Sequence, residues 1–270
     1  MDLAGKTCAA LAEMEYLSRA ETRVHSIDAR AKTLVLLAYI VALTSMNPLD
    51  LPGTVGMALY PVAMAFWSGA GLGWTFRRSL IVLPLVLGIG LFNPWFDREP
   101  GMIAGHAVGL SNGWISWGVI VLRGLLAAQA SLLLLVSTGF DRLCAAWAAW
   151  GAPRLFVDQL AMLYRYLFVL AEEAVSLQRA FAARSGGHTP GIFVWASMTG
   201  GLLARTVRRS RRIGNAMASR GYAGELPRNA TARWTVADTA FTVSWCSVFL
   251  ILRGLQPVDA WLNLVLHAIS

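Results

Sequence analysis

Long apolar stretches separated by short polar segments make up most of the chain. Five of them approach the roughly 20 residues that a helix needs to cross the hydrocarbon core of a bilayer. They are residues 33–47, 53–74, 79–96, 114–139 and 235–253. The pattern predicts an all-α polytopic membrane protein with about five transmembrane helices. Residues 255–270 are also apolar and either form a short sixth helix or lie at the membrane surface.

The segment between the fourth and fifth stretches follows a different pattern. Residues 155–184 carry leucines at helical spacing together with charges, which predicts one helix of about 30 residues. A second long helix is predicted after Pro190, apolar in its first half and rich in arginine over residues 205–212. A shorter helix is predicted from Asp141 to Gly151. We expect these helices to lie along the membrane or along one another.

Basic residues are concentrated in this segment. Residues 154–233 contain 12 Lys and Arg against four carboxylates, and this net +8 equals the formal charge of the whole chain. Since positively charged loops stay on the cytoplasmic side, the N-terminus and residues 140–234 are predicted to be cytoplasmic. Membrane lipid is the expected contact of the arginine run. Nucleic acid is not, because no aromatic residue that would stack on bases interrupts the run.

These patterns divide the chain into four predicted regions. Residues 1–32 form an N-terminal cytoplasmic or interfacial segment without a cleavable signal, in which Asp28 is placed to cap the first membrane helix. Residues 33–139 hold the first four spans. The long cytoplasmic helices occupy residues 140–234, and residues 235–270 form a C-terminal transmembrane region.

Composition supports a membrane protein and offers no cofactor site. The 270 residues are 56% hydrophobic and only 14% charged, with a mean hydropathy of +0.55, too apolar for a soluble domain of this length. The three cysteines and four histidines are widely separated, so they predict neither a disulfide framework nor a metal site. No cofactor is expected.

Two short motifs suggest enzymes, but neither is supported by its surroundings. Gly5-Lys6-Thr7 lacks the earlier glycine of a phosphate-binding loop, so any ATP hydrolysis is expected on a separate subunit. Residues 109–113 match the Gly-x-Ser-x-Gly pattern around a hydrolase nucleophile, here Ser111. That motif needs a preceding strand, which the apolar pattern does not predict, and we interpret the stretch as a turn. The chain is therefore not predicted to be an enzyme.

Arg123 lies inside the fourth apolar stretch, where a charge is costly unless it faces protein, water or headgroups. Two interpretations remain open from the sequence. The side chain extends toward the outer surface, or it meets a partner membrane subunit.

Two similar strings end the two long predicted helices. Residues 179–186 and 215–221 each place small residues and then one arginine just before a glycine. A left-handed glycine cap and a cation in the last turn are common at helix ends. Agreement over several positions favours a repeated docking element instead, because small neighbours allow a partner groove to close around the guanidinium.

The chain resembles a known family of transport proteins. The residues that carry the resemblance are Asp28-Ala29-Arg30-Ala31-Lys32, Tyr164-Arg165-Tyr166-Leu167 followed by Glu172-Glu173, and the two arginine strings. Together they resemble the transmembrane T component of energy-coupling factor (ECF) transporters, and most closely its cobalt-type form, CbiQ. The likeness covers roughly residues 25–250. Ser185 stands where the family's first motif has Gly, and Ser219 where the second has Ala.

The resemblance implies a specific function. In that family the T component has no substrate site, and it connects two ABC-type ATPase subunits to a separate membrane subunit that captures the substrate, sometimes with a small accessory membrane subunit. Its two motifs insert into grooves on the ATPases. Carried over by position, the docking residues are Ala183, Arg184, Ser185, Ser219, Arg220 and Gly221. The implied location is the bacterial cytoplasmic (inner) membrane.

Several alternatives remain at this point. The substrate is cobalt, nickel or a vitamin, because its selectivity would reside in another chain. Two other classes are a membrane enzyme using Ser111 or the late carboxylate Asp238, and a membrane scaffold without energy coupling.

Overall fold

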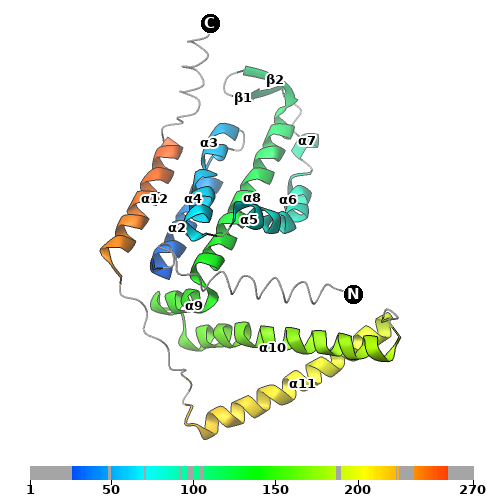
Figure 1. The fold of residues 1–270 in the computed structure, drawn as a ribbon. Coiled ribbons are helices and arrows are strands. Elements are labelled where there is room, and N and C mark those ends of the chain that lie inside the picture. Colours follow the sequence, from blue (N-terminus) through cyan, green and yellow to red (C-terminus); the bar gives the residue numbers. More distant parts are fainter. Residues whose placement is uncertain are drawn as a thin grey trace. The chain divides into compact units, whose positions relative to one another are not determined.

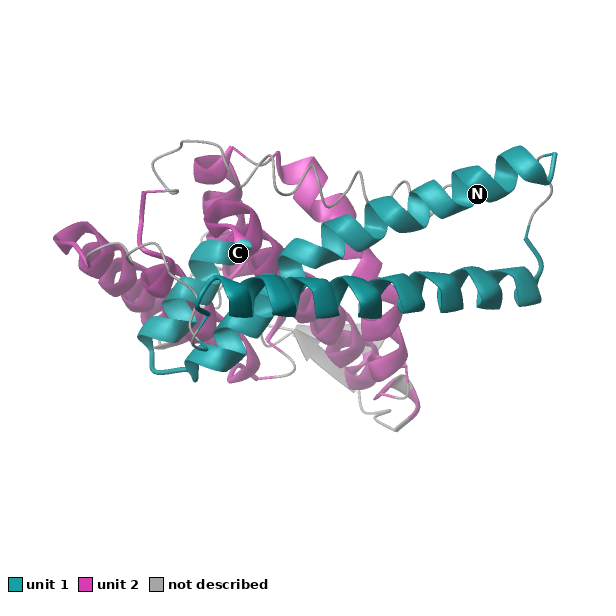
Figure 2. Ribbon diagram, turned by 90° about the horizontal axis from the view of Figure 1, so that it is seen from below, with its two compact units in different colours: residues 1–16, 140–231 teal, residues 17–139, 232–270 magenta. Residues whose placement is uncertain are grey.

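The computed structural model forms two compact units (Figure 2). Unit 1 comprises residues 1–16 and 140–231, and unit 2 comprises residues 17–139 and 232–270. The residues that the structure describes are 26–254 except 48–49, 70, 92, 97–99, 104–105, 187–189, 223 and 225–233. The predicted N-terminal segment up to residue 25 and the possible sixth helix at 255–270 lie outside them.

Unit 2 is a bundle of helices around one long central helix (Figure 1). Its helices are α2 (Ala29–Thr44), α3 (Leu51–Gly56), α4 (Leu59–Ser68), α5 (Leu72–Ser79), the 3₁₀ turn η1 (Leu80–Val82), α6 (Leu83–Gly90), α7 (Asn93–Phe96), α8 (Asn112–Thr138) and α12 (Val236–Gly254). Helix α8 packs against every helix from α2 to α7, and α12 packs against α2. The predicted all-α membrane fold is confirmed.

The core of unit 2 is held together by aromatic rings from three helices. Tyr39 of α2 lies 4.7 Å from Tyr60 of α4 between ring centroids, and both contact Phe249 of α12. Trp245 meets Tyr60 edge to face at 4.9 Å. All four side chains are buried. Aromatic pairs add to the free energy of burying their area, so this cluster fastens the first and last helices of the unit together.

Fewer continuous spans are present than predicted. Three helical segments are long and apolar enough to cross a membrane, at Leu72–Gly90, Asn112–Thr138 and Val236–Arg253, among the described residues. Helix α2 has only 16 residues. The predicted span 53–74 is two helices, because the chain turns at Met57 and Ala58 and α4 ends at Gly69, whose φ is 70°. The stretch 53–74, predicted as the second of about five spans, is therefore not one continuous helix.

The third span begins earlier than predicted. Arg77 and Arg78 were expected in a loop but lie in the last turn of α5, within the Leu72–Gly90 segment. The Arg78 guanidinium lies 4.2 Å from the centroid of the Trp74 ring. A cation stacked on an aromatic face is stabilised by the ring quadrupole, which explains how the helix continues through two charged residues.

A short hairpin occupies the predicted loop before α8. Strands β1 (Pro100–Ile103) and β2 (His106–Ser111) pair antiparallel, with an irregularity between Pro100 and Met102. Strand β2 leads directly into α8 at Asn112. The argument that no strand precedes Ser111 was therefore wrong.

Unit 1 contains three helices, α9 (Phe140–Ala149), α10 (Arg154–Arg184) and α11 (Ile192–Ser219). Helix α9 ends at Ala149, and the predicted glycine follows two residues later. Ala152 N–H donates to Trp147 O and Gly151 N–H to Ala148 O, and Gly151 has a φ of 91°. The Phe140 ring stacks on Tyr164 at 4.4 Å between centroids, which fixes α9 against α10.

Most of the surface of α10 and α11 is left uncovered. Only Val157 and Asp158 of α10 are buried, and α11 buries none of its residues against the described parts of the chain. Exposed apolar side chains include Phe193 and Leu203. Isolated long helices gain little stability from propensity alone, so helices this exposed indicate surfaces that meet other molecules.

Candidate functional site

The first arginine string ends α10 as the sequence predicts. Arg184 is the last helical residue, Ser185 is the C-cap and its N–H donates to Phe181 O at 2.9 Å. Gly186 has a φ of 62°, in the left-handed region that glycine favours. Ala183 and Arg184 are exposed, and Ser185 is half-buried.

The second string ends α11 with a complete Schellman cap. Tyr222 N–H donates to Met217 O at 3.0 Å and Gly221 N–H donates to Ala218 O at 3.1 Å, the two bonds of that motif. Gly221 has a φ of 78°. Ser219 ends the helix and its hydroxyl donates to Ala216 O, so this hydroxyl is engaged by its own helix.

The two arginines have similar surroundings but differ by one helical position. Arg184 belongs to the last turn of α10, whereas Arg220 is the C-cap residue just after α11. Both are exposed, and neither guanidinium forms an ion pair or hydrogen bond with the described residues. Each presents five donors beside a helix end, with alanine or glycine as neighbours, which leaves room for a partner to surround it.

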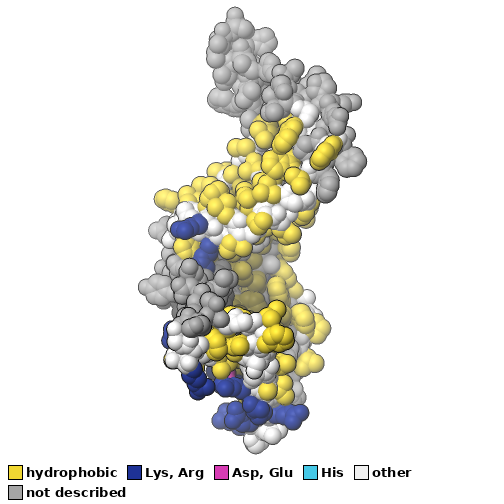
Figure 3. Space-filling view, turned by 90° about the vertical axis from the view of Figure 1, so that its right-hand side faces the viewer, with side chains coloured by type: hydrophobic (Ala, Val, Ile, Leu, Met, Phe, Trp, Pro, Cys, Tyr) yellow, Lys and Arg dark blue, Asp and Glu magenta, His cyan; other side chains and the backbone are white. Residues whose placement is uncertain are grey.

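Two arginines in the middle of α11 differ from Arg184 and Arg220 because they form ion pairs. Arg205 and Arg209 both reach Glu173 of α10, at 3.5 and 3.9 Å between nitrogen and oxygen. These pairs join the two helices where they approach one another. Arg208, Arg211 and Arg212 are exposed on the same helix. Figure 3 shows that Lys and Arg side chains gather in a patch on the face of the protein drawn there.

The two strings lie at opposite ends of α11 (Figure 1). Helix α10 ends at Arg184, the chain reverses direction, and α11 then runs back past α10 to Ser219. With 28 residues and a rise of 1.5 Å per residue, α11 is about 42 Å long. Two docking residues separated by about this length cannot enter the same small groove.

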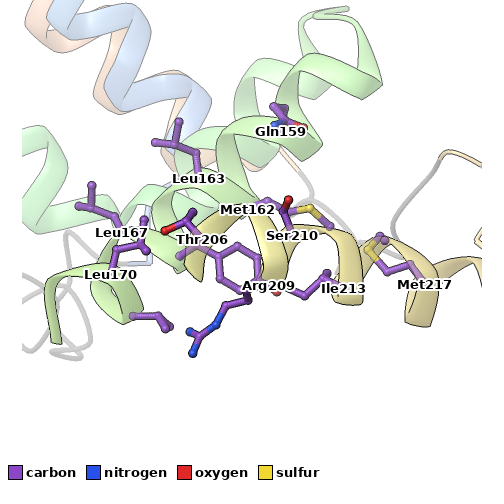
Figure 4. Close-up of a pocket in the computed structure, with 13 residues that line it drawn as sticks. Gln159, Met162, Leu163, Leu167, Leu170, Thr206, Arg209, Ser210, Ile213 and Met217 are labelled. Atoms are coloured by element: carbon purple, nitrogen blue, oxygen red, sulfur yellow. The ribbon is translucent and has the colours of Figure 1, made fainter. Parts of the chain in front are cut away.

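A groove of about 540 Å³ lies between α10 and α11 (Figure 4). Its lining is mainly apolar and includes Met162, Tyr166 and Leu170 of α10 and Ile213 and Met217 of α11. Arg209, paired with Glu173, is among its polar residues. The groove reaches Met217, whose carbonyl accepts the cap bond from Tyr222, so it approaches the second arginine string.

Ser111 lies where strand β2 leads into α8. It is the N-cap residue of α8, and its side chain makes no capping hydrogen bond. The strand-to-helix setting of a nucleophile elbow is therefore present, whereas the side chains of the four histidines lie outside the described parts of the chain.

Arg123 is bound by its own chain. Its guanidinium donates to the carbonyls of Met46 and Asn47, at 3.1 and 2.6 Å, and to Thr54 Oγ1 at 3.3 Å. The two carbonyls belong to the turn between α2 and α3, and Thr54 lies in α3 itself. The structure thus provides partners within the chain for a charge that the sequence left without one, and a partner subunit is not needed to explain it.

No metal site is formed by the described part of the chain. Within it, no group of three or more His, Cys, Asp or Glu side chains converges in a way that would hold a metal ion. Neither Cys144 nor Cys246 forms a disulfide bond among the described residues.

Comparison with known proteins decides the family. Residues 20–231 match the cobalt transport protein family, CbiQ. The chain belongs to this family. The resemblance predicted from the sequence is confirmed, and the chain is a transmembrane component of an ECF-type transporter.

Individual relatives agree with this family assignment. The cobalt transport protein CbiQ of Rhodobacter capsulatus is 27% identical over 198 residues, which cover 72% of this chain and 78% of the relative. The CbiQ protein of Salmonella typhimurium is 28% identical over 176 residues, covering 58% and 78%. The energy-coupling factor transporter transmembrane protein EcfT of Streptococcus thermophilus is 24% identical over 255 residues, covering 86% and 94%.

Proposed function

We propose that the chain is the energy-coupling subunit of an ECF-type cobalt importer. In this proposal it transmits ATP-driven motion from two ABC-type ATPase subunits to a separate membrane subunit that captures the substrate. Cobalt is chosen because the matching family and two relatives are named as cobalt transport proteins. Nickel or a vitamin is the alternative substrate, since the described residues offer no metal site that would select one.

One observation carries the docking part of the proposal. Arg184 and Arg220 are exposed and unpaired among the described residues, and they lie at opposite ends of α11. A guanidinium enclosed by a partner groove forms charge-assisted hydrogen bonds with carboxylates or carbonyls. Two such residues near the opposite ends of a helix about 42 Å long suit two separate grooves, one on each ATPase.

The helices between these residues suit the transmission of motion. Helix α11 is continuous over 28 residues and α10 over 31. Closure of an ATP-bound dimer would displace both docked ends, and a continuous helix carries such a displacement without absorbing it in a loop.

In this arrangement the N-terminus and unit 1 are cytoplasmic, and the protein lies in the bacterial inner membrane.

Co-purification of the ATPases with arginine variants tests the proposal. Arg184→Ala and Arg220→Ala should each weaken ATPase association, and the double variant should nearly abolish it, because truncating a desolvated charge contact costs about 2–5 kcal/mol. A cation that only complements a helix dipole contributes about 0.3–1 kcal/mol and would leave association almost unchanged. Arg211→Ala, an exposed arginine inside α11, is the matched control. Full retention of the ATPases by the double variant would contradict the docking role.

A further inference from the structure

Three helix ends of unit 2 meet in a polar cluster, which we call the polar junction. It is formed by the buried residues Asp28, Lys32, Ser137 and Asp238 and the exposed Thr235. Asp28 lies at the start of α2, Ser137 at the end of α8, and Thr235 and Asp238 at the start of α12. Lys32 is fully buried, and Asp28 and Asp238 are 7% and 2% exposed. Charged residues are seldom buried so completely unless they are paired.

Hydrogen bonds connect the three ends directly. Lys32 Nζ donates to Ser137 O at 2.8 Å, which joins α2 to α8. Asp28 N–H donates to Asp238 Oδ1 at 2.8 Å, which joins α2 to α12. The second oxygen, Oδ2, accepts bonds from Thr235 N–H and from its hydroxyl, so the carboxylate also caps its own helix.

The charges suit the helix dipoles at this place. Asp28 caps α2, accepting from Arg30 N–H at 2.9 Å, and Asp238 lies in the first turn of α12. Anions stabilise helix N-termini, and a cation stabilises a helix C-terminus, which is where Lys32 meets α8. The Lys32 ammonium also attracts the Asp238 carboxylate. Removing one member therefore leaves the others buried without their partner.

The position of the junction in the chain gives it a role beyond holding the bundle together. The larger segment of unit 1, residues 140–231, is joined to unit 2 at its two ends, after Gly139 and before residue 232. Ser137 precedes the first point by two residues, and Thr235 follows the second closely. Both connections therefore lead into helix ends that α2 holds through Lys32 and Asp28. Directional bonds in a buried setting resist sliding more than apolar contacts do.

We propose that Asp28, Lys32 and Asp238 are positioning residues for energy coupling. They hold both connections from unit 1 in one rigid junction. A displacement that arrives along either connection is therefore shared by α2, α8 and α12. The inference rests on the proposed function, since it needs a displacement to transmit. Asp28 Oδ2 and Thr138 Oγ1 are buried there without a hydrogen-bond partner among the described residues. A cluster built only for stability would leave fewer such groups unsatisfied.

The test measures the amount of cobalt(II) taken up per ATP hydrolysed by the complete transporter in liposomes. Asp238→Asn keeps an oxygen that can accept the Asp28 N–H bond but removes the charge, and Lys32→Met removes the ammonium at similar length. Both variants should bind the ATPases as the wild type does, while uptake per ATP falls at least about fivefold, the lower end of typical coupling between sites. Arg253→Met, an exposed cation at the other end of α12, is the control and should leave the ratio unchanged.

A purely structural role predicts a different result. It would lower the amount of assembled protein and its melting temperature while uptake per ATP stays at the wild-type value, and that outcome overturns the inference. If the Lys32→Met variant does not accumulate, the same ratio of uptake to ATP hydrolysed is measured for Asp238→Asn and for the double variant Lys32→Met/Asp238→Asn. In the double variant neither Lys32 nor Asp238 is left without its opposite charge. A wild-type complex without ATP-driven uptake would instead refute the proposed function, and the inference with it.

Discussion

Arg123 shows how one charged side chain is accommodated in a long apolar helix. The first carbonyls beyond α2 have no helical partners of their own, and the guanidinium binds two of them as well as Thr54. Unsatisfied carbonyls at helix ends are costly away from water. The arginine thus satisfies three acceptors at once and links α8 to the turn between α2 and α3.

Arg123→Met should destabilise the protein. The substitution leaves the carbonyl of the buried residue Met46 without its Arg123 donor, at a cost of about 1–3 kcal/mol for a buried group left unsatisfied. The exposed Asn47 carbonyl still accepts from Asp50 N–H. We expect a lower melting temperature in detergent, measured by loss of soluble protein on heating. Arg123→Lys should recover only part of the loss, because an ammonium lacks the planar fork. A melting temperature equal to that of Arg77→Met, an exposed control on α5, would contradict this role.

Gly221 sets the direction in which the chain leaves α11 next to Arg220. Its φ of 78° is unfavourable for residues with a Cβ atom, yet an added Cβ would meet no atom within 4 Å. The effect of a substitution at this position is therefore conformational and not steric.

Gly221→Ala should weaken ATPase association less than Arg220→Ala does. A left-handed conformation costs about 1–2 kcal/mol for an ordinary L residue, and the helix end would partly relax away from the docking geometry. Gly221→Asn should be closer to wild type, because asparagine adopts this conformation more readily. Titration of the ATPase against each variant gives the order of their affinities for the ATPase. Equal loss for Ala and Asn would show that the backbone conformation at this position does not matter for docking.

At the scale of elements, locally encoded features were predicted well and features with distant partners were not. Helices α10 and α11 and their glycine caps follow from nearby residues, and the structure has them where the sequence places them. The break after α3 does not follow from hydropathy, since Met57 and Ala58 are apolar. It is stabilised by Tyr39, whose hydroxyl donates to Met57 O at 3.2 Å from 18 positions away.

The candidate site shows the same division between local and distant signals. Both arginine strings were found from sequence because each is a short contiguous pattern. Their placement at opposite ends of α11 became visible only when the chain reversal after Gly186 was known. The polar junction could not be found: Asp28 and Asp238 meet across 210 positions, and Asp238 by itself resembles an isolated carboxylate. Asp28 as a helix cap was predicted, and its side chain does accept from Arg30 N–H.

At the scale of the whole molecule, burial differs sharply between the two units. Unit 2 has a buried aromatic core and an apolar outer surface, with exposed side chains such as Phe66, Ile81 and Leu250, as a bundle in lipid requires. Unit 1 has hardly any core, a basic α11 and an open groove. A unit of this kind depends on partners for much of its burial, which agrees with a coupling subunit that works within a complex.

The topology predicted from charge is tested by labelling single cysteines from the two sides of the membrane. Ala183→Cys at the end of α10 and Trp114→Cys in the first turn of α8 are both at exposed positions, in a background with Cys8, Cys144 and Cys246 replaced by serine. Helix α8 is one continuous span of 27 residues, about 40 Å long, so its start and the unit that follows its end should face opposite sides. A membrane-impermeant maleimide added outside should label Trp114→Cys, and Ala183→Cys should react only after the membrane is opened. Since the ATPases are cytoplasmic in the proposed complex, labelling of Ala183→Cys from outside would place the docking arginines on the wrong side and exclude the coupling role.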